Sequence, residues 1–498
     1  MSRRMPPLSK SRFMAGMQCH KRLYLACHDR ALADPVDAGT QARFDEGQEV
    51  GQIAHDLRPG GVLIEEDHLH PRQAMASTQE ALSSPDVPAL YEAAFEHEGV
   101  LIRVDILAKR PDGLFDLIEV KSSTKVKPEH KPDVGIQLWV LEGCGLPVER
   151  AMLAHIDNTY VYDGGAYDAD RLFVLEDLTA HVREHQQAYV AQLQEMSAPL
   201  TEPQPPGVDV GPHCKKPYRC SFWTHCHANQ PEHPIEDLYR LNKILRTKLL
   251  KDGVTSIDQI PDRYPGLSEI QQRMRRCVKS GQPYINPKMK RILQSWGRPL
   301  YFLDFETIGS ALPKYANTRP YEPIPFQWSL HSLQGDGSIG HSEYLHDGLD
   351  DPRPHVVDLL LEAAGSEGKV VHYEPYEATM LTKLADAVPE RATELTALAT
   401  RLVDISAVIK DHCYHPSMHG SFSLKSVLPA LLPGEGYGEL DIADGTAASV
   451  AFTEMLNPDI GADRVDTLRA NLIAYCRYDT EATLKIYQKL SESQAGKQ

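Results

Sequence analysis

Two acidic residues, Asp304 and Glu306, stand one residue apart at the end of an apolar run. In a β-strand, alternate side chains point to the same face, so these two carboxylates would lie side by side. Two neighbouring negative charges on a hydrophobic strand are costly without a counter-ion, and Mg²⁺ or Mn²⁺ prefers carboxylate oxygens. The pattern indicates a divalent-metal site. The alternative is a solvent-facing strand end with two ordinary acids.

A second reactive group combines Asp105 with Glu119 and Lys121. Glu119 and Lys121 alternate onto one face of the strand predicted for residues 114–121. Asp105 lies on the strand predicted for residues 99–107, and a turn joins the two strands. Two carboxylates that hold a metal ion beside a lysine are typical of a hydrolytic site, in which lysine orients water or stabilises charge on phosphate. A surface cross-strand ion pair is the alternative.

Three cysteines, Cys214, Cys220 and Cys226, follow a C-x₅-C-x₅-C spacing. In a reducing compartment, clustered cysteines indicate metal binding before disulfides. A [4Fe–4S] cluster needs four thiolates, and Cys19 is our choice for the fourth because it too has basic and aromatic neighbours. Free thiols are one alternative. A zinc site is another, although its usual C-x₂₋₄-C spacing is tighter. The histidines considered for that zinc site are His213, His225 and His227.

Length, net charge and N-terminal composition limit the number of domains, the partners and the location that can be expected. At 498 residues the chain is too long for a single core, so roughly two to four domains are expected. The net charge of −17 supports no general affinity for polyanions, so nucleic-acid contacts would come from local basic groups and bound metals. No apolar leader or long apolar run is present, which favours a reducing, cytoplasmic location.

The elements that would position the N-terminal residues are helices and a linker. We expect helices over residues 8–28, 41–58 and 133–142. The second carries Gly47 and Gly51, followed by His55, which indicates close packing or the approach of a ligand; a helix–helix contact with a surface histidine is the alternative. The third helix bears Gln137. Residues 196–213 are rich in Pro and Gly and are predicted to form a linker.

The remaining chain changes from helical to mixed structure. Residues 230–297 are predicted to be helical and locally basic, which suits either a phosphate backbone or solvated helix faces. Strands are then expected over residues 300–308, 325–333, 341–346, 369–373 and 401–405. The last predicted helix, residues 467–490, carries Tyr475 and Asp479 four residues apart, so both lie on one face.

The C-terminal block resembles a DnaQ-like (DEDD) exonuclease with a ribonuclease-H-like fold. Asp304 and Glu306 match its first motif, D-x-E, and Tyr475 and Asp479 match the Y-x-x-x-D motif of its tyrosine subclass. Glu377 stands where the second motif usually has Asp, so the metal geometry can differ there. The resemblance implies that the four acids bind two Mg²⁺ or Mn²⁺ ions and hydrolyse single strands 3′→5′. It also implies that Tyr475 positions the water.

The N-terminal block resembles a RecB-family nuclease of the PD-(D/E)xK class. Asp105, Glu119 and Lys121 match its catalytic core. His55 matches its G-x-x-x-H position, and Gln137 matches the start of its Q-x-x-x-Y motif, whose tyrosine is replaced here. The resemblance implies that His55 helps Asp105 and Glu119 to hold a metal ion, and that Gln137 positions the substrate strand.

The cysteines resemble those of the iron–sulfur form of the RecB-like family, in which one cysteine precedes and three follow the nuclease core, with the spacing C-x₂-C-x₅-C. The whole arrangement is similar to bacterial proteins that fuse a RecB-like nuclease to an exonuclease domain of unknown function. We therefore expect an α/β chain with a restriction-endonuclease-like nuclease domain at 1–229, a basic helical connector at 230–297 and an exonuclease domain at 298–498.

The expected activity is metal-dependent hydrolysis of single-stranded DNA in repair, recombination or defence. The expected cofactors are Mg²⁺ or Mn²⁺ and a [4Fe–4S] cluster, with Zn²⁺ as the alternative to the cluster. Two other functions remain open. One is an RNA-processing exonuclease, and the other is a nucleic-acid-binding protein in which one nuclease site has decayed.

Overall fold

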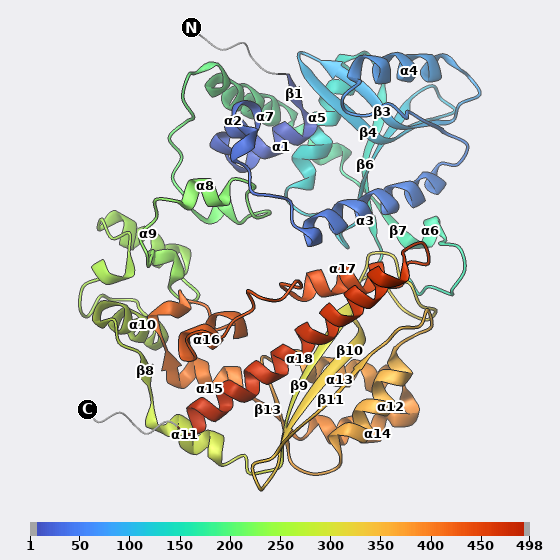
Figure 1. The fold of residues 1–498 in the computed structure, drawn as a ribbon. Coiled ribbons are helices and arrows are strands. Elements are labelled where there is room, and N and C mark those ends of the chain that lie inside the picture. The colour runs from blue at the N-terminus through green and yellow to red at the C-terminus, as the bar shows by residue number, and fades with distance from the viewer. Residues whose placement is uncertain (1–6, 493–498) are drawn as a thin grey trace. The chain divides into compact units, whose positions relative to one another are not determined.

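The computed structural model describes residues 7–492 and shows mixed α/β architecture (Figure 1). The chain divides into two compact units. The described residues up to Asn229, together with Ser310–Glu322, form the first unit. Gln230–Gly309 and the described residues from Pro323 form the second. Residues 230–297, expected as a separate connector, thus belong to the second unit. No helix within residues 7–492 has a stretch long and apolar enough to cross a bilayer.

A seven-stranded sheet forms the centre of the first unit. Its order is β2-β3-β4-β5-β6-β7, and β1 pairs with β4. The strands are β1 (Leu8–Ser9), β2 (Val62–Leu63), β3 (Ala89–His97), β4 (Val100–Lys109), β5 (Phe115–Lys121), β6 (Val148–Ile156) and β7 (Phe173–Asp177). The helices are α1 (Lys10–Gln18), α2 (His20–His28), α3 (Ala38–Ala54), α4 (Pro71–Ser83), α5 (His130–Gly143), α6 (Ala169–Leu172), α7 (Thr179–Ser197) and α8 (Trp223–His227).

Helices cover both faces of this sheet. On one face, Leu117 of β5 packs in a core with α1, α2, α5 and α7. On the other face, Ile118 packs with Val50 and Ala54 of α3. Because side chains alternate along a strand, Glu119 follows Leu117 onto the face that α5 covers. A strand covered on both sides explains why the adjacent residues Leu117 and Ile118 are both apolar and buried.

The helix expected over residues 8–28 is interrupted. Cys19 has an extended backbone, with φ −166° and ψ 123°, and separates α1 from α2. No Gly or Pro marks this break, so the local pattern predicts one continuous helix. The break places Cys19 at the junction of two helices rather than within one.

A five-stranded sheet in the second unit has the order β11-β10-β9-β12-β13. Strands β9, β10 and β11 are antiparallel neighbours, and β12 and β13 run parallel to β9. The strands are β9 (Leu300–Ile308), β10 (Ile324–Leu333), β11 (Ile339–Leu345), β12 (Lys369–His372) and β13 (Leu402–Asp404). A separate pair joins β8 (Tyr284–Ile285) to β14 (Cys413–Tyr414). The five expected strands are confirmed, with small shifts at their ends.

The two faces of this sheet carry different helices. Leu300 and Phe302 of β9 share a core with α18, whereas Leu303 and Phe305 pack with α12, α13 and α14. Figure 1 shows α18 crossing one side of the sheet and the other three helices on the opposite side. The helices are α9 (Lys243–Lys251), α10 (Glu269–Ser280), α11 (Pro287–Gln294), α12 (Arg353–Ala364), α13 (Tyr376–Ala387), α14 (Ala392–Ala399), α15 (Ile405–His412), α16 (Leu424–Leu431), α17 (Gly445–Met455) and α18 (Ala462–Glu492).

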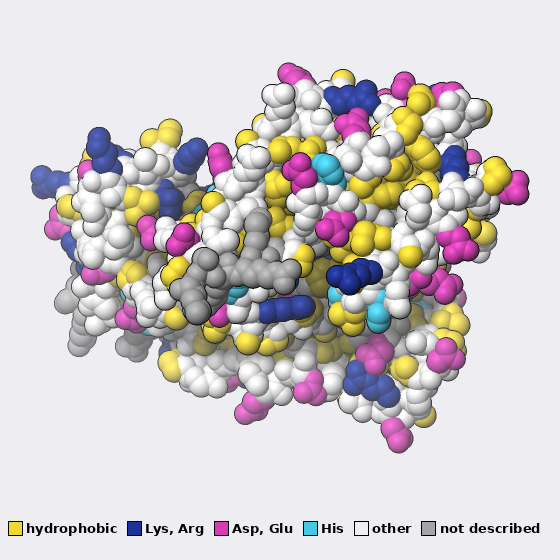
Figure 2. Space-filling view, turned by 90° about the horizontal axis from the view of Figure 1, so that it is seen from above, with side chains coloured by type: hydrophobic (Ala, Val, Ile, Leu, Met, Phe, Trp, Pro, Cys, Tyr) yellow, Lys and Arg dark blue, Asp and Glu magenta, His cyan; other side chains and the backbone are white. Residues whose placement is uncertain are grey.

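Part of the basic segment 230–297 is structural rather than exposed. Arg273 is buried and donates to the backbone carbonyls of Lys410 and Asp411. Arg275 is also buried and pairs with Asp262. These two arginines are therefore engaged within the protein and do not face a phosphate backbone. On the face shown in Figure 2, Lys and Arg side chains occur in small groups among Asp and Glu, as the net charge of −17 leads one to expect.

Candidate metal-binding sites

Four carboxylates from three elements meet beside α18. Asp304 and Glu306 come from β9, Glu377 from the first turn of α13, and Asp479 from the middle of α18. The strand alternation that places Phe302 against α18 also directs the two β9 acids to that side. Glu377 is only 2% exposed, and Glu306 and Asp479 are buried.

Each of these acids is held toward its neutral form. Burial, followed by the charges of Asp479, Glu306 and Glu377, holds the pKa of Asp304 well above its usual value. Burial and the Asp479 charge raise the pKa of Glu306 in the same way. Burial raises the pKa of Asp479 to about 6. The carboxylates thus repel one another in a poorly solvated site, the condition that a divalent cation relieves.

Cys476 adds a sulfur to this group. Its thiol donates to Oδ2 of Asp304 at 3.7 Å, and the ligand atoms of Asp304, Glu306 and Cys476 all lie within 4.8 Å of one another. Burial and the Asp304 charge hold the pKa of the thiol well above its usual value, so it remains a neutral donor. Its position directly after Tyr475, within the Y-x-x-x-D motif, was the only sequence signal for it.

A histidine lies beside Glu377. Nδ1 of His372, at the end of β12, lies 3.5 Å from Oε2 of Glu377. Burial opposes protonation of His372, but the neighbouring Glu377 carboxylate and the hydrogen bond to the carbonyl of Glu374 leave its pKa raised overall. Between them, Glu374 adopts the left-handed φ of 77°, which turns the chain from the strand into α13. The chain thus enters α13 by a sharp turn, and Glu377 lies in the first turn of that helix.

Two tyrosines and a lysine border Asp479. Tyr475 lies one helical turn before it on α18, and the hydroxyl of Tyr437 donates to its Oδ1. Nζ of Lys425 donates to the hydroxyl of Tyr475 at 3.3 Å and lies 5.2 Å from the centre of the Tyr437 ring. Tyr475 was predicted from the sequence, whereas Lys425 and Tyr437 were not. Lys425 and Tyr437 lie between the motif that holds Glu377 and the motif that holds Tyr475, and no local sequence pattern distinguished them.

In the first unit, Glu119 is surrounded by donors. It is 1% exposed, and its oxygens accept from Lys10 Nζ at 2.9 and 3.0 Å, from Lys121 Nζ at 2.5 Å and from Gln137 Nε2 at 2.7 Å. Burial alone would raise its pKa, but Lys10 and Lys121 hold the pKa of Glu119 below its usual value. The structure thus brings together three of the predicted residues, and Lys10 joins them unforeseen.

Asp105 and Asp133 complete this cluster. Oδ2 of Asp105 accepts from the backbone N–H of Val120 at 2.7 Å, and burial with the Glu119 charge raises the pKa of Asp105 to about 7. Oδ2 of Asp133 lies 2.7 Å from Nζ of Lys121. Asp133 was missed, although its position one helical turn before Gln137 was a usable signal.

His55 occupies a different environment. Its ring stacks on Tyr91 with centroids 3.9 Å apart and an interplanar angle of 5°. Burial lowers its pKa, and Glu92 and Asp56 are the acids that oppose this. Within residues 7–492, His55 forms no hydrogen bond or ion pair with Asp105 or Glu119. The resemblance to RecB-family nucleases assigns His55 to the cluster of Asp105 and Glu119. In the described structure its ring nitrogens do not bond to either acid.

The four predicted cysteines line one pocket of the first unit. They are Cys19, Cys214, Cys220 and Cys226, and all four are free thiols. Lys21 and Arg22 line the same pocket. Burial raises the pKa of Cys220, and the neighbouring sulfurs of Cys19 and Cys226 add to that effect while Arg22 opposes it. Four thiols from two distant segments, with cations beside them, fit the donor set of a metal cluster.

The backbone around this pocket is well tied. Nε2 of Gln18 donates to the carbonyls of His213 at 2.7 Å and Tyr218 at 2.8 Å, which links the end of α1 to the cysteine-rich segment. The backbone N–H of Cys220 donates to the carbonyl of Cys214 at 2.8 Å. Of the histidines considered for zinc, His213 and His227 also line the pocket, and His225 lies on α8.

Comparisons with known proteins add one finding. No curated protein matches the chain. Residues 301–423 match a family described as a domain of unknown function, DUF2779. The matched region contains Asp304, Glu306 and Glu377 and ends before Asp479, so three of the four clustered acids lie within a segment similar to the DUF2779 family.

Proposed function

We propose that this chain is a metal-dependent nuclease whose principal site is the carboxylate cluster of the second unit. The observation that carries the proposal is the convergence of Asp304, Glu306, Glu377 and Asp479, all with raised pKa values, from β9, α13 and α18. Buried carboxylates that crowd one another are unfavourable, and divalent cations are their usual partners. The strand order of the sheet supports a ribonuclease-H-like domain of the DnaQ-like (DEDD) type.

The four acids would hold Mg²⁺ or Mn²⁺, which supply water activation and stabilisation of the leaving oxygen in phosphodiester hydrolysis. The protein's own groups orient the reactants. Burial and the Asp479 charge raise the pKa of Tyr475, so its hydroxyl keeps its proton and can hold a water by hydrogen bonding. Lys425, which donates to Tyr475, places a positive charge where the phosphate would approach.

We assign 3′→5′ hydrolysis of single-stranded DNA to this site by its resemblance to the tyrosine subclass of DEDD exonucleases. The assignment extends to repair, recombination or defence as the biological setting. The same arrangement of acids is compatible with RNA, so an RNA-processing exonuclease is the first competing function. The DNA and RNA exonuclease functions differ in substrate and share the same mechanism.

The cluster of Asp105, Glu119, Lys121 and Gln137 supports a second, RecB-like nuclease site. One observation favours the alternative of a silent, nucleic-acid-binding site. Nζ of Lys10 approaches Glu119, Asp133 and Asp105 within 4.0 Å, and with Lys121 it supplies two positive charges to three carboxylates. A divalent cation would have to displace or share this ammonium group.

For the cysteine pocket we propose a [4Fe–4S] cluster held by Cys19, Cys214, Cys220 and Cys226. It would join the α1–α2 junction to a segment almost 200 residues later in the chain. Closing so long a loop restricts the unfolded chain and so stabilises the folded unit. The cluster's role is therefore structural, and zinc is the alternative occupant.

The decisive experiment measures hydrolysis of end-labelled single- and double-stranded DNA and RNA by the full-length protein with Mg²⁺, Mn²⁺ or a chelator. Asp304→Asn is compared with Asp336→Asn, an exposed acid in the β10–β11 turn, and with Lys121→Ala. We expect Asp304→Asn to abolish metal-dependent release of mononucleotides and Asp336→Asn to retain it. Loss of residual endonucleolytic cleavage in Lys121→Ala alone would assign that cleavage to the first unit.

If Asp304→Asn releases nucleotides at the rate of the unaltered protein, the carboxylate cluster is not the exonuclease site. If only RNA is degraded, the RNA-processing function replaces the DNA function. If neither polymer is cut but both are bound, the chain is a binding protein.

A further inference from the structure

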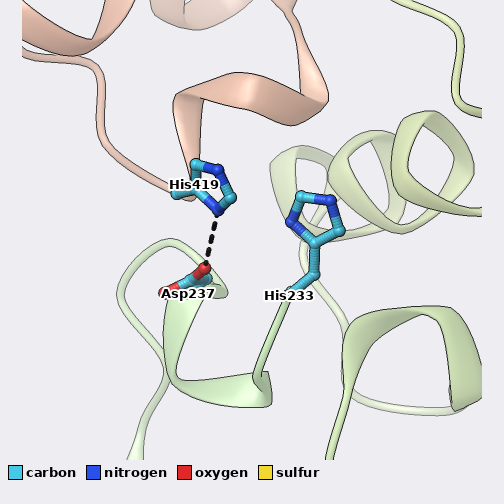
Figure 3. A group of neighbouring side chains, drawn as sticks. All are labelled: His233, Asp237 and His419. Carbon is cyan, nitrogen blue, oxygen red and sulfur yellow. Dashed lines mark ion pairs between the residues drawn. The ribbon is translucent and has the colours of Figure 1, made fainter. Parts of the chain in front are cut away.

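A second constellation of metal-binding side chains lies apart from the acids and the cysteines, in the second unit. His233, Asp237 and His419 each offer one ligand atom, and these atoms lie within 4.8 Å of one another. Nδ1 of His419 is 3.7 Å from Oδ2 of Asp237, and the His233 and His419 rings stack with centroids 4.9 Å apart. Figure 3 shows the His419 ring above the Asp237 carboxylate and the His233 ring beside both.

The backbone holds the first two ligands in place. His233 and Asp237 lie at the two ends of a tight turn around Pro234. The carbonyl of His233 accepts from the N–H of Ile257 at 2.8 Å, and the N–H of Asp237 donates to the carbonyl of Pro234 at 3.0 Å. Their spacing is therefore fixed by main-chain hydrogen bonds rather than by a metal.

The third ligand is brought in by a second turn packed directly on the first. His419 has a left-handed φ of 44°, and Gly420 follows with φ 77°. A Cβ on Gly420 would lie 1.8 Å from the backbone oxygen of Asp237, so only glycine allows the two turns to approach this closely. The conformation of His419 is uncommon for a side-chain-bearing residue and places its ring over Asp237.

The donors suit one class of ion. Two imidazoles and one carboxylate form a typical ligand set for zinc and similar divalent transition metals. Nδ1 of His233 is buried and has no hydrogen-bond partner in the described structure, which is unusual for a buried polar atom. A tetrahedral site with bonds of about 2.0–2.2 Å separates its ligand atoms by roughly 3.3–3.6 Å, so small side-chain rotations would close the observed group around an ion.

We propose that His233, Asp237 and His419 bind one zinc-like divalent transition-metal ion. The ion is coordinated by three side chains and leaves a coordination position for water, because His419 is half exposed. It ties the segment that precedes α9 to the turn that follows β14, about 180 residues later in the chain. This site is independent of the proposed nuclease activity and of the cysteine pocket.

The test uses the full-length protein in excess Mg²⁺, which is added to compete with zinc at the proposed carboxylate sites. Zinc retained per chain after equilibrium dialysis is measured for the unaltered protein, His233→Ala, His419→Ala and Asp237→Asn. His68→Ala removes an exposed histidine outside the group and is the control. We expect His233→Ala and His419→Ala to lose one zinc per chain, Asp237→Asn to bind it at least about tenfold more weakly, and the control to be unchanged.

Cobalt titration identifies the ligands. Nitrogen and oxygen ligands give weak ligand-field bands without the thiolate charge-transfer absorption of a cysteine site, and these bands should vanish in His419→Ala. Equal zinc content in the unaltered protein and in Asp237→Asn and His419→Ala overturns the proposal, as does equal loss in His68→Ala. Because Asp237→Asn preserves side-chain volume, it decides the matter if an alanine variant fails to fold.

Discussion

Nζ of Lys10 lies 2.9 Å from Oε1 of Glu119, although 109 residues separate them. The lysine stands at the first position of α1, directly after β1 pairs with β4, and the glutamate lies on β5 beside that strand. The pairing of β1 with β4 thus places the side-chain ammonium group of Lys10 in the acidic cluster of the first unit. Burial opposes protonation of Lys10, but Glu119, Asp133 and Asp105 outweigh it and raise its pKa.

We therefore predict that Lys10→Met changes both stability and cation binding. Glu119 keeps Lys121 and Gln137, so the free energy of unfolding should fall by about 1–3 kcal/mol in the absence of metal. The remaining acids lose one positive neighbour, so Mn²⁺ should raise the melting temperature of Lys10→Met more than that of the unaltered protein. Differential scanning calorimetry with and without Mn²⁺ measures both effects.

Lys125→Met, at an exposed position of the same unit, is the matched control and should change neither quantity. An equal Mn²⁺-induced shift in Lys10→Met and in the unaltered protein would show that Lys10 does not compete with cations at this cluster. Loss of a first-unit nuclease activity in Lys10→Met, with Mn²⁺ binding retained, would instead give the lysine a direct role at the scissile phosphate.

Features set by local sequence could be predicted, whereas features set by long-range contacts could not. The strand predicted over 300–308 is confirmed as β9, because alternation and apolar content report the local environment of each face. The same alternation correctly predicted that Asp304 and Glu306 share a side. Lys10 and Tyr437 were missed because their roles depend on contacts with residues more than 40 positions away, which no local period encodes.

Two further differences have tertiary causes that the pattern did not reveal. The predicted helix over 8–28 breaks at Cys19 without Gly or Pro, since tertiary packing overrides helix propensity there. His55 was placed by a motif, but its ring stacks on Tyr91 because that tyrosine projects toward the end of α3 and donates to the carbonyls of His55 and Arg58. A motif specifies residue types and spacing, and neighbouring side chains decide the orientation.

Glu377→Gln should reduce the proposed exonuclease rate by on the order of 100-fold, because a neutral amide is a poor ligand for Mg²⁺. The side chain is 2% exposed and its volume is preserved, so the fold should persist. Glu374→Gln alters an exposed acid three residues earlier and is the control. Single-turnover rates at several Mg²⁺ concentrations measure the effect, and partial rescue at high Mg²⁺ is expected. Equal rates in the two variants would remove Glu377 from the ligand set.

The raised pKa of Asp479 predicts a specific pH dependence of stability. The pKa rises from 3.8 to about 6 on folding, so the folded protein binds this proton more tightly than the unfolded chain. The resulting stabilisation is complete below about pH 4 and is lost as the pH rises through about 6, a change on the order of 3 kcal/mol. In chelator, the free energy of unfolding of Asp479→Asn should therefore decline less between about pH 4 and about pH 7 than that of the unaltered protein.

Urea unfolding at a series of pH values measures this difference. At neutral pH, Mg²⁺ should restore stability to the unaltered protein and much less to Asp479→Asn, because the ion replaces the proton as the partner of the carboxylates. Parallel pH profiles for the two proteins in chelator would mean that Asp479 has an ordinary pKa and that the acids are not crowded.

Removing one pocket cysteine should release the whole cluster. Cys220 is buried and lines the pocket together with the other three cysteines, so Cys220→Ala leaves too few thiolates to hold [4Fe–4S]. We expect anaerobically purified Cys220→Ala to lose both iron and acid-labile sulfide, with the visible absorbance of the cluster. It should also unfold at a lower temperature, because the cluster then no longer reinforces the link that the hydrogen bonds of Gln18 make between the α1–α2 junction and the cysteine-rich segment. Cys144→Ala, at an exposed thiol outside the pocket, should retain iron, sulfide and melting temperature. The unaltered protein could instead contain one zinc per chain and no iron. If Cys220→Ala then loses that zinc, the pocket remains a metal site and zinc replaces the cluster. Equal metal content in all three proteins would remove the pocket from the metal-binding part of the chain, and the even cysteine spacing would then have no ligand to explain it.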